Sequence, residues 1–165
     1  MIGKKVQKAI NEQISKELYS AHLYLAMSMD ADLKGFKGAA KWFKVQYQEE
    51  TGHAMKFMSY LLDQGAAVEL GAIAKPPTSF GSLLDMFEKT LKHEQTITKS
   101  INALMNLALA ENDHGTRILL DWYVTEQIEE EKNDNDVLTY LRMAGNSTGT
   151  LLMLDKQLGK RGAAG

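Results

Sequence analysis

Four glutamates, each in a different part of the chain, are the residues whose type and setting most clearly suggest chemistry: Glu17, Glu50, Glu94 and Glu130. Each stands among apolar residues at spacings of three, four and seven, which return to the same face of a helix. The face around Glu50, for instance, carries Phe43 and Phe57. The pattern therefore predicts four carboxylates on the buried faces of four helices, where a core is expected.

Burial of four carboxylates needs compensation. One buried carboxylate without a partner costs several kcal/mol, and four would match the whole stability of a domain, about 5–15 kcal/mol. Protonation, hydration, basic partners or bound cations can compensate, but basic residues at helical spacing from these glutamates are scarce. Two divalent ions would balance the four charges. A dinuclear metal site is therefore the simplest neutral arrangement.

His53 follows Glu50 by three residues, which places an imidazole and a carboxylate on one helix face. This Glu-x-x-His pattern is weak alone, but with inward glutamates on three other helices it is typical of carboxylate-bridged dimetal bundles. Oxygen donors with one imidazole suit manganese or iron better than structural zinc. We expect one metal position with an imidazole and one with oxygen donors only: Glu17, Glu50 and His53, and Glu50, Glu94 and Glu130.

The segment around Glu130 has no second histidine and is rich in carboxylates. Gln127 lies on the same helix face as Glu130. Because no second histidine is present to supply a nitrogen ligand, we expect the second metal position to bind its ion more weakly and to let it enter and leave. Glu49, Glu126 and Glu129 can join Glu130 in a third, outer metal position. A solvated acidic helix face explains these three residues equally well.

The elements that must position these residues are helices. Proline-free segments with helical periodicity span residues 4–33, 39–64, 82–112 and 116–144, and a short fifth segment spans 147–158. No strand pattern is present, so the chain of residues 1–165 is expected to be one all-α domain. Short connections at 34–38 and 113–115 favour antiparallel neighbours. Residues 65–81 can span about 53 Å, longer than a helix of about 42 Å, so they predict a crossover that makes the middle helices parallel.

Composition narrows the class of protein. The net charge of −2 offers no strong positive field for nucleic acid. The absence of cysteine excludes disulfides and thiolate metal sites. No apolar run is long enough to span a membrane, and the first residues do not form the apolar core of a signal peptide. We expect a cytoplasmic protein with no nucleic-acid or membrane partner.

Several motifs together resemble the prokaryotic non-haem ferritins over nearly the full chain. They are Glu17-Leu18-Tyr19-Ser20 with Tyr24, Gln48-Glu49-Glu50-x-x-His53, His93-Glu94, and Trp122-Tyr123-Val124-x-Glu126-Gln127-x-Glu129-Glu130-Glu131. The resemblance implies a ferritin-like four-helix bundle with a long crossover between helices two and three and a short fifth C-terminal helix. It also implies an iron-storage protein, a shell of 24 subunits, that oxidises Fe(II) with dioxygen and stores a ferric oxyhydroxide mineral.

The resemblance also implies roles for individual residues. Glu17, Glu50, His53, Glu94 and Glu130 would form the diiron ferroxidase centre, and Glu49, Glu126, Glu129 and Glu130 a third iron site. Gln127 and Tyr24 would lie beside the centre. Position 52 is Gly where bacterioferritins carry a haem-ligating methionine, so no haem is expected. Arg117 and Leu120 stand where animal ferritins line their pores with acidic residues, so the resemblance does not indicate by which route iron enters.

Two other classes remain as alternatives. A catalytic dimetal bundle, such as a rubrerythrin-like peroxide reductase or a manganese catalase, would turn over hydrogen peroxide without accumulating mineral. A metal-free helical interaction module, with its glutamates facing solvent, would bind no stoichiometric iron.

Overall fold

A computed structural model describes residues 2–162 of the chain. The described part consists of helices and connections, with no strand: α1 (Lys4–Leu33), α2 (Lys37–Asp63), α3 (Leu83–Ala110), α4 (His114–Ala144) and α5 (Thr148–Leu158). The all-α fold with a short fifth helix is therefore confirmed. Local chemistry fixes some boundaries, since Ser82 and Asp85 form a reciprocal capping box at the start of α3.

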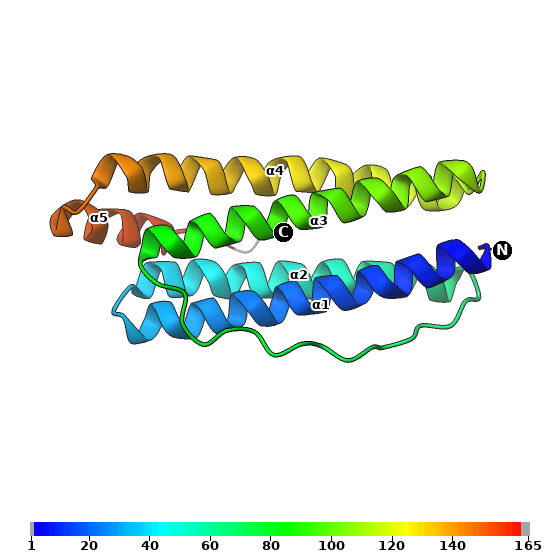
Figure 1. Ribbon diagram of the computed structural model, residues 1–165, viewed down its shortest axis with the longest axis horizontal. Coiled ribbons are helices and arrows are strands. Elements are labelled where there is room, and N and C mark those ends of the chain that lie inside the picture. The colour runs from blue at the N-terminus through cyan, green and yellow to red at the C-terminus, as the bar shows by residue number, and fades with distance from the viewer. Residues whose placement is uncertain (1, 163–165) are drawn as a thin grey trace.

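The connections order the bundle as their lengths predict. α1 and α2 form one antiparallel hairpin, and α3 and α4 form another (Figure 1). The long connection after α2 runs back along α1 for the length of the bundle, so α2 and α3 point in the same direction (Figure 1). A connection this long is needed because α3 begins at the end of the bundle where α2 also begins.

The core consists of two apolar clusters at different levels of the bundle. One, toward α5, includes Tyr24, Phe43 and Phe87. The other, toward the opposite end, includes Ile14, Phe57 and Tyr123. The predicted metal ligands fall between these clusters along each helix, so apolar packing encloses a polar layer on both sides.

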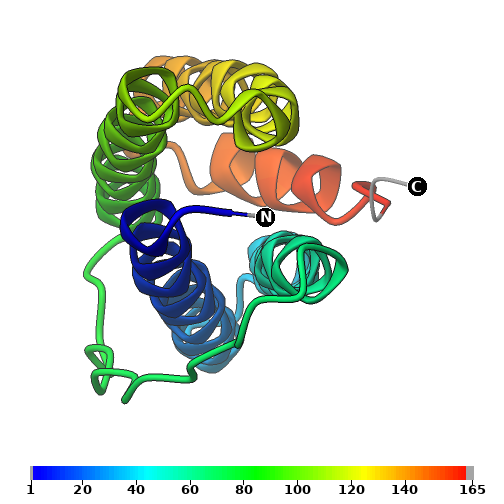
Figure 2. The ribbon, with the colours of Figure 1, turned by 90° about the vertical axis from the view of Figure 1, so that its right-hand side faces the viewer.

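Helix α5 lies on the side of the bundle formed by α2 and α4 (Figure 2). Its buried Asp155 accepts hydrogen bonds from the backbone N–H groups of Gly38 and Ala39, at 3.0 and 2.8 Å. These bonds satisfy two of the backbone N–H groups that have no partner within the first turn of a helix. The N-cap residue of α2, Phe36, makes no such bond with its side chain.

This contact corrects the expected start of the second helix. The sequence places residue 38 in a connection, but α2 begins at Lys37 and Gly38 lies in its first turn. A Cβ on Gly38 would lie 1.6 Å from the carbonyl oxygen of Asp155, so only glycine allows this close approach. Gly115, also assigned to a connection by sequence, lies in the first turn of α4.

Candidate metal centre

The first predicted metal position is formed by Glu17 from α1 and by Glu50 and His53 from α2. One potential ligand atom from each of these residues lies within 4.8 Å of the others, and among the described residues no other group of three acidic or histidine side chains meets this limit. All three side chains are buried. Gln13 donates to Glu17 at 2.8 Å, while the second carboxylate oxygen of Glu17 has no partner. A carboxylate oxygen without a donor is free to bind a cation.

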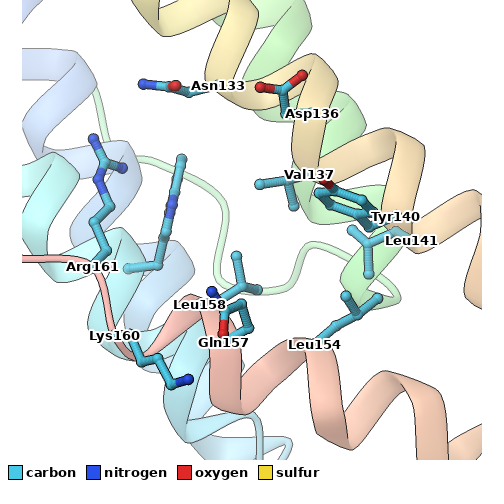
Figure 3. A pocket seen from close by; sticks show the side chains of 11 residues that line it. Asn133, Asp136, Val137, Tyr140, Leu141, Leu154, Gln157, Leu158, Lys160 and Arg161 are labelled. Atoms are coloured by element: carbon cyan, nitrogen blue, oxygen red, sulfur yellow. The ribbon is translucent and has the colours of Figure 1, made fainter.

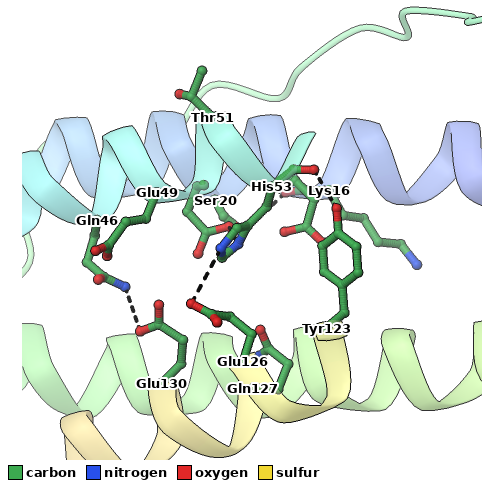
Figure 4. A network of polar contacts seen from close by, with 12 residues as sticks. Lys16, Ser20, Gln46, Glu49, Thr51, His53, Tyr123, Glu126, Gln127 and Glu130 are labelled. Atoms are coloured by element: carbon green, nitrogen blue, oxygen red, sulfur yellow. Dashed lines mark hydrogen bonds and ion pairs between the residues drawn. The ribbon is translucent and has the colours of Figure 1, made fainter. Parts of the chain in front are cut away.

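The residues of the second predicted position are buried at the same level but are held by neutral partners. Tyr24 donates a short hydrogen bond to one oxygen of Glu94, and Gln127 donates to the other oxygen at 3.0 Å. Gln46 donates to Glu130 at 3.0 Å (Figure 4). These bonds draw Glu94 and Glu130 toward their own partners, so Glu50, Glu94 and Glu130 do not converge as closely as the first group.

Burial makes three carboxylic acids of this layer weaker acids than usual: Glu50, Glu94 and Glu130. The pKa of Glu50 is raised well above its usual value, mainly by burial and then by the charges of Glu94 and Glu17. Burial raises the pKa of Glu94 to about 7, although the hydrogen bonds from Tyr24 and Gln127 oppose it. Burial and the charge of Glu94 raise the pKa of Glu130 to about 8. At neutral pH these side chains therefore retain protons that a bound cation would displace.

The third, outer position is only partly assembled. Glu126 lies 3.8 Å from the Nε2 atom of His53 (Figure 4), while Glu129 is exposed to solvent. Glu49 forms an ion pair at 2.7 Å with Arg161, whose guanidinium packs over Trp42. The basic partner of Glu49 thus comes from beyond α5 and not from its own helix.

Arg161 borders a pocket of about 500 Å³ on the same side of the bundle. Val137 and Tyr140 of α4 form one wall, and Leu154 and Leu158 of α5 form the other (Figure 3). Helix α5 thus leaves an apolar hollow between itself and α4, next to the cation that pairs with Glu49.

Sequence reasoning missed three polar residues of the buried layer: Gln13, Gln46 and Asp134. Each lies four residues from a predicted ligand, namely Glu17, Glu50 and Glu130, and so shares its helix face. That spacing was the available signal. His93, next to Glu94 in sequence, is not part of the group of ligand atoms and contacts Ser20 at 2.7 Å.

Comparison with known proteins supports one family. A model of the ferritin-like domain matches residues 7–144. The chain is 40% identical to a bacterial non-heme ferritin of Bacteroides fragilis over 161 residues, 98% of this chain and 100% of that protein. It is also 40% identical to a bacterial non-heme ferritin of Campylobacter jejuni over 158 residues, 96% of this chain and 95% of that protein.

The solved structures agree with these matches. An open pore ferritin from the archaeon Archaeoglobus fulgidus superposes with a TM-score of 0.97 at 42% identity, covering 98% of this chain and 100% of that one. Among the described helices of the present chain, none is long and apolar enough to cross a membrane.

Proposed function

The chain belongs to the ferritin-like domain family, and on that premise we propose that it is an iron-storage ferroxidase. It oxidises Fe(II) with dioxygen inside the bundle and stores the ferric oxyhydroxide within a shell made of copies of itself. The observation that carries the proposal is the buried group of Glu17, Glu50 and His53, whose ligand atoms lie within 4.8 Å of one another. Glu94 and Glu130 complete the layer from the other hairpin.

Fe(II) is the substrate in this proposal. Glu17, Glu50 and His53 bind one ion, and Glu50, Glu94 and Glu130 bind the second, so Glu50 serves both. Each iron gives up one electron and dioxygen accepts both, which avoids a one-electron step to superoxide. Anionic oxygen donors favour Fe(III) over Fe(II), since the product carries the higher charge.

The protein groups around the ligands prepare the layer for this chemistry. Tyr24 and Gln127 fix both oxygens of Glu94, and Gln46 fixes Glu130. The apolar clusters on both sides limit the access of water. As metal binds, Glu94 and Glu130 release the protons that their raised pKa values hold near neutral pH.

Two further parts of the proposal come from the family. The shell has 24 subunits, and Glu49, Glu126, Glu129 and Glu130 bind oxidised iron on its way to the cavity. Because Arg161 already pairs with Glu49, an ion at this outer position must displace the guanidinium or share Glu49 with it.

A paired substitution tests the oxidation step. The Glu50→Ala, His53→Ala protein is loaded anaerobically with Fe(II) and mixed with dioxygen, and the absorbance of the ferric product is followed by stopped flow. We expect oxidation to slow by more than about tenfold, because both predicted positions lose a ligand. The matched control replaces the same residue types at exposed positions of α1, Glu12→Ala with His22→Ala, and keeps the parental rate.

Parental oxidation by the Glu50→Ala, His53→Ala protein would refute the site assignment. Size measurement before and after aerobic iron loading tests storage separately, because a shell of about 24 subunits gains iron without changing its subunit count. Turnover of hydrogen peroxide without iron accumulation would instead favour the peroxide-reducing class.

A further inference from the structure

One turn from the proposed iron ligands, toward α5, the bundle contains two more buried polar side chains. Asp134 follows Glu130 by four residues on α4, and Gln46 precedes Glu50 by four residues on α2. Because α2 and α4 run in opposite directions (Figure 1), both residues are displaced toward the same end of the bundle. Both have no exposed surface.

These side chains present oxygen atoms that no donor satisfies. Neither carboxylate oxygen of Asp134 has a hydrogen-bond partner, and the amide oxygen of Gln46 has none either. The amide nitrogen of Gln46 donates to Glu130 at 3.0 Å, which brings the residue up to the second proposed iron position. Buried oxygens without donors are strongly unfavourable by themselves, and a cation is the partner that satisfies several of them at once.

The charges around Asp134 agree with this location. Beyond burial itself, the charges of Glu94 and Glu130 raise the pKa of Asp134, and Asp134 in turn raises the pKa of Tyr24. Arg161 is close enough to oppose the shift of Asp134. Its guanidinium nevertheless pairs with Glu49 at 2.7 Å, and no hydrogen bond joins it to Asp134. The arginine therefore leaves the oxygens of Asp134 without a donor.

We infer that Asp134, Glu130 and Gln46 form a further binding position for a hard divalent cation, occupied by Fe(II) when the protein is loaded. The inference rests on the proposed function, because Glu130 is shared with the diiron pair. Two carboxylates and an amide oxygen are the donors that such ions prefer. The position differs from the outer one, since Glu126 lies one turn from Glu130 in the opposite direction along α4.

Manganese(II), a hard ion that dioxygen does not oxidise readily, is the probe. Parent and Asp134→Asn proteins are titrated calorimetrically, and crystals of both are soaked in manganese chloride for anomalous difference maps. We expect a peak between Asp134, Gln46 and Glu130 in the parent and a stoichiometry lower by one ion per subunit in the variant. Asp136→Asn is the matched control, because Asp136 is exposed on the same helix and pairs with Lys132.

A second variant and a second readout separate a metal ligand from a structural group. Gln46→Leu removes the amide oxygen of Gln46 and should lose the same ion. With metal removed by a chelator, Asp134→Asn should unfold at no lower a temperature than the parent, because Asp134 has no hydrogen-bond partner to lose. A lower unfolding temperature with unchanged stoichiometry would mean that Asp134 serves Arg161, and it would overturn the inference.

The maps also distinguish this inference from the proposed function. Manganese at Glu17, Glu50 and His53, with none at Asp134, overturns the inference alone. Manganese at neither place overturns both.

Discussion

Metal binding to this protein should release protons in an amount that falls as the pH rises. Glu94 and Glu130, with pKa values of about 7 and about 8, carry about 0.9 and about 1.0 proton at pH 6. At pH 8 they carry about 0.1 and about 0.5. Displacement by a cation therefore releases about 1.9 protons from this pair at pH 6 and about 0.6 at pH 8.

The difference of about 1.3 protons between the two pH values is the quantity to measure. Burial and the charges of Glu94 and Glu17 also raise the pKa of Glu50, so a proton from Glu50 adds to the release from the pair. A pH-stat titration with manganese(II) records the base needed to hold the pH as the sites fill. Glu94→Gln should lower the release by about 0.9 proton at pH 6 and by less at pH 8, where Glu94 itself carries only about 0.1 proton and the rest of the loss comes from the lower pKa of Glu130 without the charge of Glu94. The exposed substitution Glu88→Gln should change neither value.

A release that stays the same from pH 6 to pH 8 would refute this reasoning. It would mean that the carboxylates are ionised before metal arrives and that burial does not govern their protonation. A pH dependence that is undiminished in Glu94→Gln would refute only the assignment to Glu94, because Glu130 alone should retain a smaller one.

Four other outcomes follow from the contacts described. Asp155→Ala should destabilise the metal-free protein by about 1–2 kcal/mol in urea denaturation, because it removes two hydrogen bonds at the start of α2. An unchanged denaturation midpoint would mean that α5 does not cap α2. Gly38→Ala should lower the thermal midpoint at least as much, since its Cβ would meet the Asp155 carbonyl oxygen. In the presence of a chelator, protonated Glu130 stabilises the folded protein fully below a pH of about 4.5, the pKa of Glu130 in the unfolded chain, and this stabilisation is lost as the pH rises through about 8, its pKa in the folded protein. Thermal scans at pH 6 and pH 8.5 should therefore show the higher midpoint at pH 6. Tyr24→Phe removes a hydrogen bond that lowers the pKa of Glu94, so manganese affinity at pH 7 should fall about fivefold in calorimetry, a loss of about 1 kcal/mol.

The sequence predicts the helices and the convergence of the acids because both depend on periodicity. Apolar residues at spacings of three and four define each buried face, so a glutamate on that face can be recognised without coordinates. The length of residues 65–81 likewise determines which helices can be parallel. The structure confirms the helices and the parallel direction of α2 and α3.

Contacts between distant parts of the chain could not be predicted in this way. Asp155 caps α2 from a position 117 residues beyond Gly38, and Arg161 pairs with Glu49 across 112 residues. No spacing rule relates such residues, because tertiary packing decides which ends meet. Asp134 is an intermediate case, since its helix face is predictable but its lack of a partner is visible only in three dimensions.

The two hairpins of the bundle divide the acidic layer between them. The hairpin of α1 and α2 carries Glu17, Glu50 and His53, while the hairpin of α3 and α4 carries Glu94 and Glu130. Ions bound between the two hairpins would therefore cross-link them in addition to taking part in the reaction. Removing the ions leaves neighbouring acids on opposite hairpins. The contact between the two hairpins should therefore be the first part of the metal-free protein to open locally, and bound iron would stabilise the protein that holds it.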